Sequence, residues 1–449
     1  MQVKNNKIVH VLFLVLILSL TVYYLFSVGF YLSNYPFMKD DSKCMIEQFA
    51  HNYLEGNLIQ KLQYFFSISN WPHPKISIRL LTIFDYYLTG EINFIHIKFF
   101  SLLSFLGFGS LFYLLGNAKD KLVLSFPSLC VVFIPNISNH WAVLTSVPLT
   151  AMLCMLSFYF IYKDKLLLSI LFCFLISFNA FDGIIVFGLA ICLNLLLNYK
   201  NLGERCLRIK LSLQLISFAT VCFMLKVFVI NVQRLDSRLD TNVASLSLGN
   251  FFEIFENFWS FSFMILRQTY NTGSFIFFII TFLLTVFASI NVLKSFKEGD
   301  NNPLIFYFSF IYYLGFGLIL SIYKFGENVD VFYLNYRFNI NSFFTLSLLL
   351  YLLLYRTVCL KYLILKVIVI SALMIPLHIK SHSHLSKVIY NGFVQKRAIG
   401  EMIKAKKAMR KTKKLRKQEI KYIEHYKIYS EYAIPYDLFT NEKLLEYIE

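Results

Sequence analysis

The sequence predicts an all-α protein that crosses a membrane about eleven times, and three observations support this. The composition is 57% hydrophobic with a mean hydropathy of +0.59. Only 15% of the residues are charged, whereas soluble domains carry about 25%. Apolar runs recur along the chain, most of them at lengths that suit about 30 Å of hydrocarbon although 122–135 and 166–180 are short, and Lys and Arg gather in alternate connections between them.

The first apolar run predicts a retained anchor. A short basic segment, Met1 to Lys7, precedes an apolar run from Ile8 to about Leu32. The run is too long for a signal peptide and lacks a small-x-small cleavage site. Ten further runs follow, and a break at Asn179–Gly183 divides the stretch 166–198 into a predicted hairpin. The predicted spans are 8–32, 93–116, 122–135, 141–162, 166–180, 183–198, 211–231, 274–293, 303–323, 338–355 and 362–379.

The basic residues predict the orientation. On this model the inner connections hold Lys4, Lys7, Lys119, Lys121, Lys163, Lys165, Lys200–Lys210, Lys294, Lys297, Arg356 and Lys361. The short outer connections 136–140 and 179–182 hold neither Lys nor Arg. This pattern predicts a cytoplasmic N-terminus and, with eleven spans, an extracytoplasmic tail. The tail has a net charge of +8, whereas the rule places an excess of Lys and Arg on the cytoplasmic side. Segments longer than about 60 residues escape the rule.

Two long connections and the tail complete the predicted organisation. The transmembrane domain covers 1–379, with a first extracytoplasmic loop at 33–92 and a second at 232–273; a basic C-terminal segment covers 380–449. In the second loop, Phe251–Ile265 has acids on one side and aromatic rings on another, which predicts a helix lying in the membrane interface.

Composition also argues against a nucleic-acid-binding protein and against a protein built on zinc or disulfides. The net charge of +17 lies largely in loops and the tail, and no nucleic-acid-binding motif occurs, so we predict no nucleic-acid partner. The eight cysteines form no CxxC pair, which argues against a zinc site or a disulfide framework.

Two adjacent acids, Asp40 and Asp41, follow the first predicted span. The plainer interpretation is a pair of solvated loop acids, or an N-cap for a following helix. At a bilayer surface, Asp40 could instead take a proton from an acceptor hydroxyl, while Asp41 tunes it or helps to bind a divalent cation. No cofactor is predicted with certainty, and metal dependence stays open.

Other polar residues lie on the same predicted outer side. Arg79 and Arg337 suit a phosphate, because the planar guanidinium bonds two oxygens at once, and His73 could bond the same group. The plainer roles are headgroup contacts for the arginines and a rigid loop for His73, which lies between two prolines. Asn139 and His140 begin a span, and Asp182 lies in the hairpin break. An acid at membrane depth is a candidate functional residue, although near a turn it can simply be hydrated.

These residues together resemble the multi-pass bacterial GT-C glycosyltransferases, which use sugars carried on polyprenyl phosphates. The resemblance rests on K-D-D-S (39–42), on His73 followed six residues later by Arg79-Leu80-Leu81, and on F-D-Y-Y-L-T-G (84–90). Later blocks are S-N-H-W (138–141), S-F-N-A-F-D-G-I-I-V-F (177–187) and N-Y-R-F (335–338). The chain departs from the pattern at Pro74, where a basic residue is usual, and at Asn335-Tyr336.

The resemblance implies an enzyme of the bacterial plasma membrane with an outward-facing site. Asp40 would be the base of an inverting transfer from a polyprenyl-phosphate sugar to a glycan or lipid acceptor, with membrane lipids around the site. His73, Arg79 and Arg337 would bind the lipid phosphate, and Asn139, His140 and Asp182 would line the cavity.

Three alternatives stay open. A transporter or flippase for lipid-linked oligosaccharides would need polar residues through the middle of its spans and discontinuous helices in repeated halves. A surface-polysaccharide polymerase or ligase would rely on loop arginines without an essential carboxylate. A structural membrane scaffold is the third.

Overall fold

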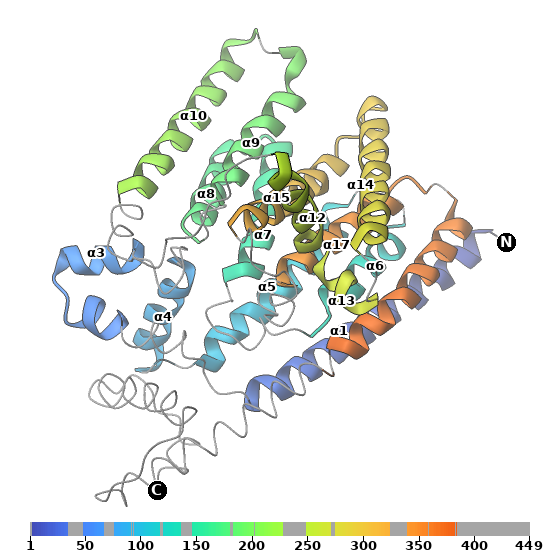
Figure 1. The fold of residues 1–449 in the computed structure, drawn as a ribbon, viewed down its shortest axis with the longest axis horizontal. Coiled ribbons are helices and arrows are strands. Elements are labelled where there is room, and N and C mark those ends of the chain that lie inside the picture. Colours follow the sequence, from blue (N-terminus) through green and yellow to red (C-terminus); the bar gives the residue numbers. More distant parts are fainter. Residues whose placement is uncertain are drawn as a thin grey trace, which may run out of the picture.

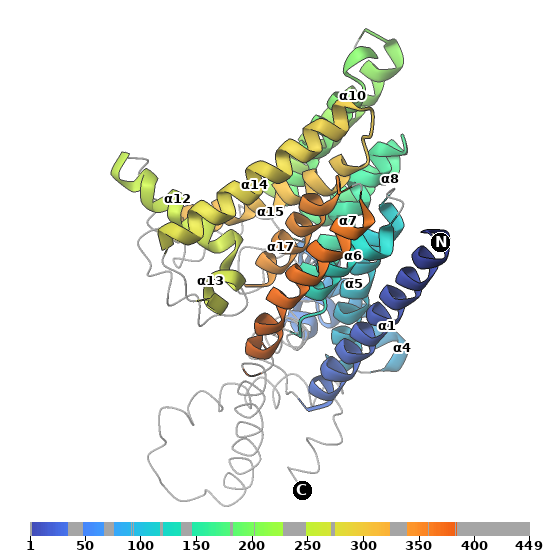
Figure 2. The ribbon, with the colours of Figure 1, turned by 90° about the vertical axis from the view of Figure 1, so that its right-hand side faces the viewer.

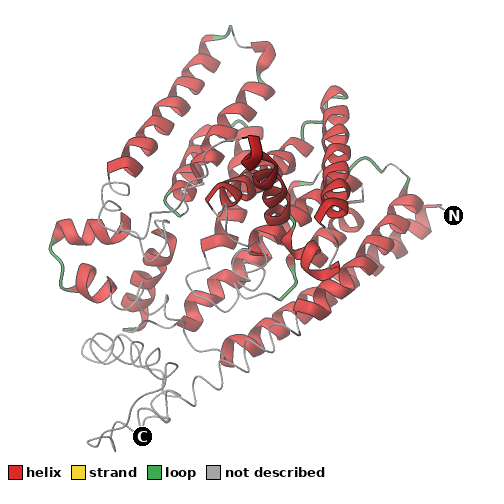
Figure 3. Ribbon diagram, viewed as in Figure 1, coloured by secondary structure: helices red, strands yellow, loops and turns green. Residues whose placement is uncertain are grey.

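The computed structural model describes an all-helical chain. The described residues are 2–34, 48–66, 76–90, 92, 94–116, 120–135, 146–179, 183–201, 203–227, 248–270, 274–323, 339–357, 359–381 and 383. Within these ranges every regular element is a helix and no strand occurs (Figure 3). The predicted fold class, an α-helical protein, is therefore confirmed at this level.

The helices follow one another with short connections over much of the chain. Their bounds are α1 Gln2–Asn34, η2 Phe49–Leu54, α3 Leu58–Phe66, α4 Ile76–Thr89, α5 Phe94–Leu115, α6 Lys121–Val132, α7 Ser146–Tyr162, α8 Leu166–Ser177, α9 Gly183–Leu197, η5 Tyr199–Asn201, α10 Arg205–Leu225, α12 Leu248–Ser262, α13 Met264–Tyr270, α14 Ser274–Lys297, α15 Pro303–Tyr323 and α17 Asn339–Leu354. A further apolar helix, Leu360–Ser381, is called the last helix below.

Each predicted apolar run has its own helix among the described residues. Five are long and apolar enough to cross a membrane: α1, α5, α10, α14 and the last helix. Six are shorter apolar helices: α6, α7, α8, α9, α15 and α17. The separate helices α8 and α9 confirm the predicted break at Asn179–Gly183. These helices fit a membrane-embedded protein, while the count of eleven crossings and their orientation stay predictions.

The interior of the bundle is aromatic. Helices α5, α6, α7, α15 and α17 pack together, and α1, α10, α14 and the last helix lie around them (Figures 1 and 2). Phe108 meets Phe344 at 4.8 Å between ring centroids, and Phe306 stacks on Tyr351 at 4.2 Å. The four outer helices bury at most 28% of their apolar windows, against 56% for α5. Their exposed apolar side chains therefore suit contact with lipid.

The connections predicted to be cytoplasmic lie at one end of the bundle. Asp120, before α6, lies 3.6 Å from His10 of α1. The α14–α15 turn meets the ends of α5 and α17, because Asn302 donates to the Leu115 carbonyl at 2.7 Å and Asp300 accepts from the Tyr355 hydroxyl at 2.8 Å. The ring of Tyr199, at the α9–α10 turn, lies 6.5 Å from that of Phe296. We call this the basic end.

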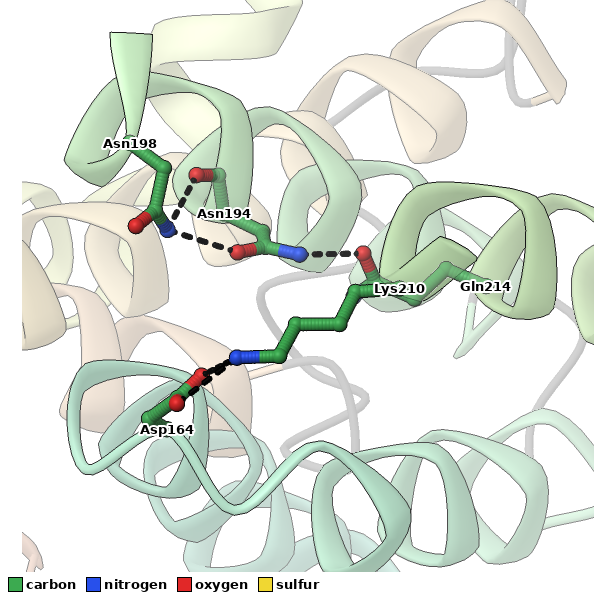
Figure 4. A network of polar contacts seen from close by, with 5 residues as sticks. All are labelled: Asp164, Asn194, Asn198, Lys210 and Gln214. Carbon is green, nitrogen blue, oxygen red and sulfur yellow. Dashed lines mark hydrogen bonds and ion pairs between the residues drawn. The ribbon is translucent and has the colours of Figure 1, made fainter. Parts of the chain in front are cut away.

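A polar network fastens α10 at the basic end (Figure 4). Lys210 Nζ lies 2.6 Å from a carboxylate oxygen of Asp164, in the α7–α8 turn. One side of α10 packs on α9, where the buried Asn194 amide donates to the Gln214 side-chain oxygen at 2.7 Å. Asn198 donates to the side-chain oxygen of Asn194 at 2.9 Å. Because α10 buries little apolar surface, these directional contacts define its position.

The helix predicted in the membrane interface forms, but its aromatic side faces protein. It corresponds to α12 and the start of α13, and α12 packs along α15. Gly317 of α15 permits the close approach, since a Cβ there would lie 2.2 Å from the Ser262 hydroxyl oxygen. Trp259 is buried, with its ring 5.8 Å from that of Phe278 on α14. Helices α14 and α15 thus cover the aromatic side of α12, while its place in the membrane interface stays a prediction.

Candidate functional site

The structure describes one member of the predicted site, Arg79. The others lie outside the described residues: Asp40, Asp41, His73, Asn139, His140, Asp182 and Arg337. Their convergence with Arg79 on one cavity therefore stays a prediction. The site is built here from Arg79 and from the described residues around it.

Helix α4 carries Arg79 and begins against the α8–α9 break. The first backbone N–H groups of a helix have no partner within the helix. In α4 the Ile76 N–H donates to the Phe178 carbonyl at 3.1 Å, and the Ser77 N–H donates to Asn179 Oδ1 at 2.9 Å. Asn179 thus caps α4 from a distant part of the chain, as an N-cap residue would locally. This contact fixes α4 on the turn that precedes α9.

Arg79 is held inside the protein. Its side chain is only 2% exposed, and Nη2 donates to Gln48 Oε1 at 3.2 Å. The guanidinium also lies over the ring of Tyr64 on α3, at 5.1 Å from the centroid, which is a cation–π contact. Arg79 therefore lies in a pocket of side chains from η2 and α3.

A second polar contact joins α4 to α5. Asp85 is 5% exposed, and its Oδ1 lies 2.8 Å from Nδ1 of His96. His96 remains half-exposed, with 49% of its side chain accessible. Lys98, one turn into α5, is only 1% exposed. A buried carboxylate that hydrogen-bonds one imidazole nitrogen fixes the orientation of the ring and leaves the other nitrogen to its surroundings.

Sequence reasoning missed Asp85, His96 and Lys98 as candidates. The block 84–90 counted toward the resemblance, but its acid was given no role. A usable signal was present: Asp85, His96 and Lys98, together with Glu91, fall within the stretch 85–98 that leads into a span, where such residues are rare and usually face the protein interior.

The α8–α9 break depends on close packing. Gly183 begins α9 against the end of α8, where a Cβ would lie 2.5 Å from the Ile176 carbonyl oxygen. Only glycine permits this approach without a shift of backbone. The break therefore holds Asn179 where it can cap α4, which in turn places Arg79.

The described residues contain no group of three or more His, Cys, Asp and Glu that could hold a metal ion. The cation predicted at Asp40 and Asp41 falls outside them. Comparisons of the chain with protein-family models, with curated proteins and with solved structures return no match.

Proposed function

We propose that this protein is a membrane glycosyltransferase of the GT-C type, which moves a sugar from a polyprenyl-phosphate carrier to a glycan or lipid acceptor on the outer face of the membrane. One observation carries the proposal. Three charged side chains are buried among the described residues, namely Arg79, Asp85 and Lys98, and all belong to α4 and the first turn and a half of α5. This region lies away from the basic end, on the side where the sequence predicts the acceptor and donor to meet.

The proposed reaction uses the acid pair and the arginines. Asp40 takes the proton of the acceptor hydroxyl as that oxygen forms a bond to the anomeric carbon. The bond from the anomeric carbon to the phosphate oxygen breaks, and its electron pair leaves with the polyprenyl phosphate. Arg79 and Arg337 stabilise the negative charge that grows on the phosphate, which favours the transition state over the ground state.

The distribution of buried charge favours a site at one face over a path through the membrane. A transporter of lipid-linked sugars needs ionisable or polar groups along its spans. At the basic end, the described buried polar groups are amides and hydroxyls such as Asn194, Gln214 and Asn302, which hydrogen-bond within the protein. They fasten helices together, so they support the transferase over the transporter.

The test is a transfer assay in reconstituted vesicles with synthetic polyprenyl-phosphate hexoses. We expect Asp40→Asn to abolish release of polyprenyl phosphate and Arg79→Lys to reduce it strongly, because lysine cannot bond two phosphate oxygens at once. Arg356→Lys, at the basic end, is the matched control and should leave transfer unchanged.

Folding of each variant is checked by its melting temperature. Transfer that persists in Asp40→Asn would remove the carboxylate mechanism and favour the polymerase alternative. Movement of the lipid-linked hexose across the vesicle without transfer would favour the transporter.

A further inference from the structure

Helix α4 exposes a stripe of large apolar side chains. Leu80, Phe84, Tyr87 and Leu88 are 46%, 57%, 69% and 69% exposed. Their spacing of i, i+4, i+7 and i+8 places them on one face of the helix. Contiguous apolar surface of this kind on a folded protein marks contact with a partner or a membrane.

The opposite face of α4 is buried and carries polar side chains of the helix. Ile78, Thr82 and Asp85 lie at i, i+4 and i+7 and are at most 5% exposed, and Arg79 beside them is 2% exposed. A helix on the surface of a water-soluble domain has the reverse arrangement, with charged residues outward and apolar residues inward. Charged side chains turn toward the protein interior when the exterior is hydrocarbon, because lipid cannot solvate them.

The same arrangement continues into α5. Phe99, Phe100 and Leu103 are exposed, while Lys98 and Ser101 are buried. Helix α5 meets the length and composition required of a membrane span, so its exposed apolar side suits acyl chains. Helix α4 packs against α5, and the Asp85–His96 contact of 2.8 Å ties the two together. The apolar stripe of α4 therefore belongs to a helix that packs on a span whose own exposed side chains suit lipid.

We infer that α4 is immersed in the membrane, with its Leu80–Phe84–Tyr87–Leu88 stripe against lipid acyl chains and its Arg79–Asp85 face against the protein. The segment 76–89, assigned from the sequence to an extracytoplasmic loop, is then part of the membrane-embedded body. Lipid is the occupant because α4 packs on a helix long and apolar enough to span a membrane and because its charged side chains are directed away from the stripe. This placement is independent of the transfer reaction proposed above.

Tryptophan substitution tests the inference in the full-length protein. Phe84→Trp and Tyr87→Trp are made separately at exposed positions that accept a larger ring. Each protein is reconstituted into phosphatidylcholine vesicles with or without bromine on the acyl chains, and the emission of the unsubstituted protein is subtracted. We expect the added emission of both variants to lose most of its intensity in brominated vesicles and to resist quenching by aqueous iodide.

Two control variants show the quenching expected for a tryptophan in lipid and for one in water. Phe287→Trp reports an exposed position on the span α14, and His51→Trp reports an exposed polar position on η2. We expect quenching by bromine at the first and by iodide at the second. If tryptophans at positions 84 and 87 are quenched by iodide and not by brominated lipid, as expected for the His51 variant, α4 lies in water and the inference is overturned. Emission shielded from both quenchers would indicate a protein partner and would overturn it equally.

Discussion

At the basic end of the bundle, charged side chains pair at the surface, whereas at the α4–α5 end they are buried. Asp164, the partner of Lys210, is 70% exposed, and Glu298, the partner of Arg356, is 62% exposed. Arg79 and Asp85 are almost fully covered, and each has a polar contact with a neighbouring element. The charged side chains at the two ends therefore lie in different surroundings, exposed to solvent at the basic end and buried at the α4–α5 end.

The contrast indicates where substitutions matter. Exposed ion pairs contribute about 0–1 kcal/mol each, because water and salt screen them. Buried polar groups must keep their partners, since an unpaired one costs about 1–3 kcal/mol. The basic end can tolerate changes of charge, provided that topology is preserved. The α4–α5 end depends on each contact, as expected of a region that positions functional groups.

The largest expected effect concerns the packing that holds α4. Gly183→Ala forces a methyl group against the Ile176 carbonyl, so we expect a loss of about 3 kcal/mol of unfolding free energy. Gly188→Ala in the same helix meets nothing within 4 Å and is the matched control. It should leave stability unchanged or raise it by up to about 1 kcal/mol. Equal behaviour of the two variants in mixed-micelle unfolding would refute the close packing at the break.

The second-largest loss of stability is expected when the buried guanidinium of Arg79 is removed. We expect Arg79→Ala to cost about 2 kcal/mol, because it opens a cavity beside Tyr64 and removes the donor to Gln48. Arg79→Lys keeps the charge without the planar fork and should fall between wild type and alanine. The same unfolding assay measures both. If Arg356→Ala were as destabilising as Arg79→Ala, the contrast between the two ends would be lost.

An intermediate effect is expected in the amide network of the basic end. Asn194→Leu leaves Gln214 without its donor inside the bundle, and interhelical hydrogen bonds of this kind contribute roughly 1 kcal/mol. The double variant Asn194→Leu/Gln214→Leu should lose less than the sum of the single variants, because neither orphaned amide remains. Strictly additive losses in a double-mutant cycle would show that the pair does not interact.

The smallest effect is expected at Glu298. The hydrogen bond from Arg356 lowers the pKa of this carboxyl, so the pair contributes at neutral pH and is lost as the pH falls through the lowered pKa. Because the Glu298 side chain is largely exposed to solvent, we expect Glu298→Gln to have the same melting temperature as wild type at physiological salt. A clear difference that disappears on acidification would assign this pair a structural role.

Local pattern predicted the apolar helices well, but it did not predict the neighbours of Arg79. The apolar runs marked each helix, and the interruption at Asn179–Gly183 marked the break between α8 and α9. Hydrophobicity did not reveal that Arg79 faces Gln48 and Tyr64, because these partners lie on η2 and α3. Which neighbours cover the aromatic side of α12 was likewise open, since a lipid-facing and a protein-facing aromatic stripe have the same composition.

The sequence by itself determined the apolar helices that the described residues form and the grouping of basic turns, because length, hydropathy and charge are properties of each segment alone. Only the tertiary structure decided that α4 turns Arg79 and Asp85 inward and its leucines and aromatic rings outward. The direction of a side chain on a helix depends on which neighbour covers each face, and in this chain those neighbours are distant in sequence.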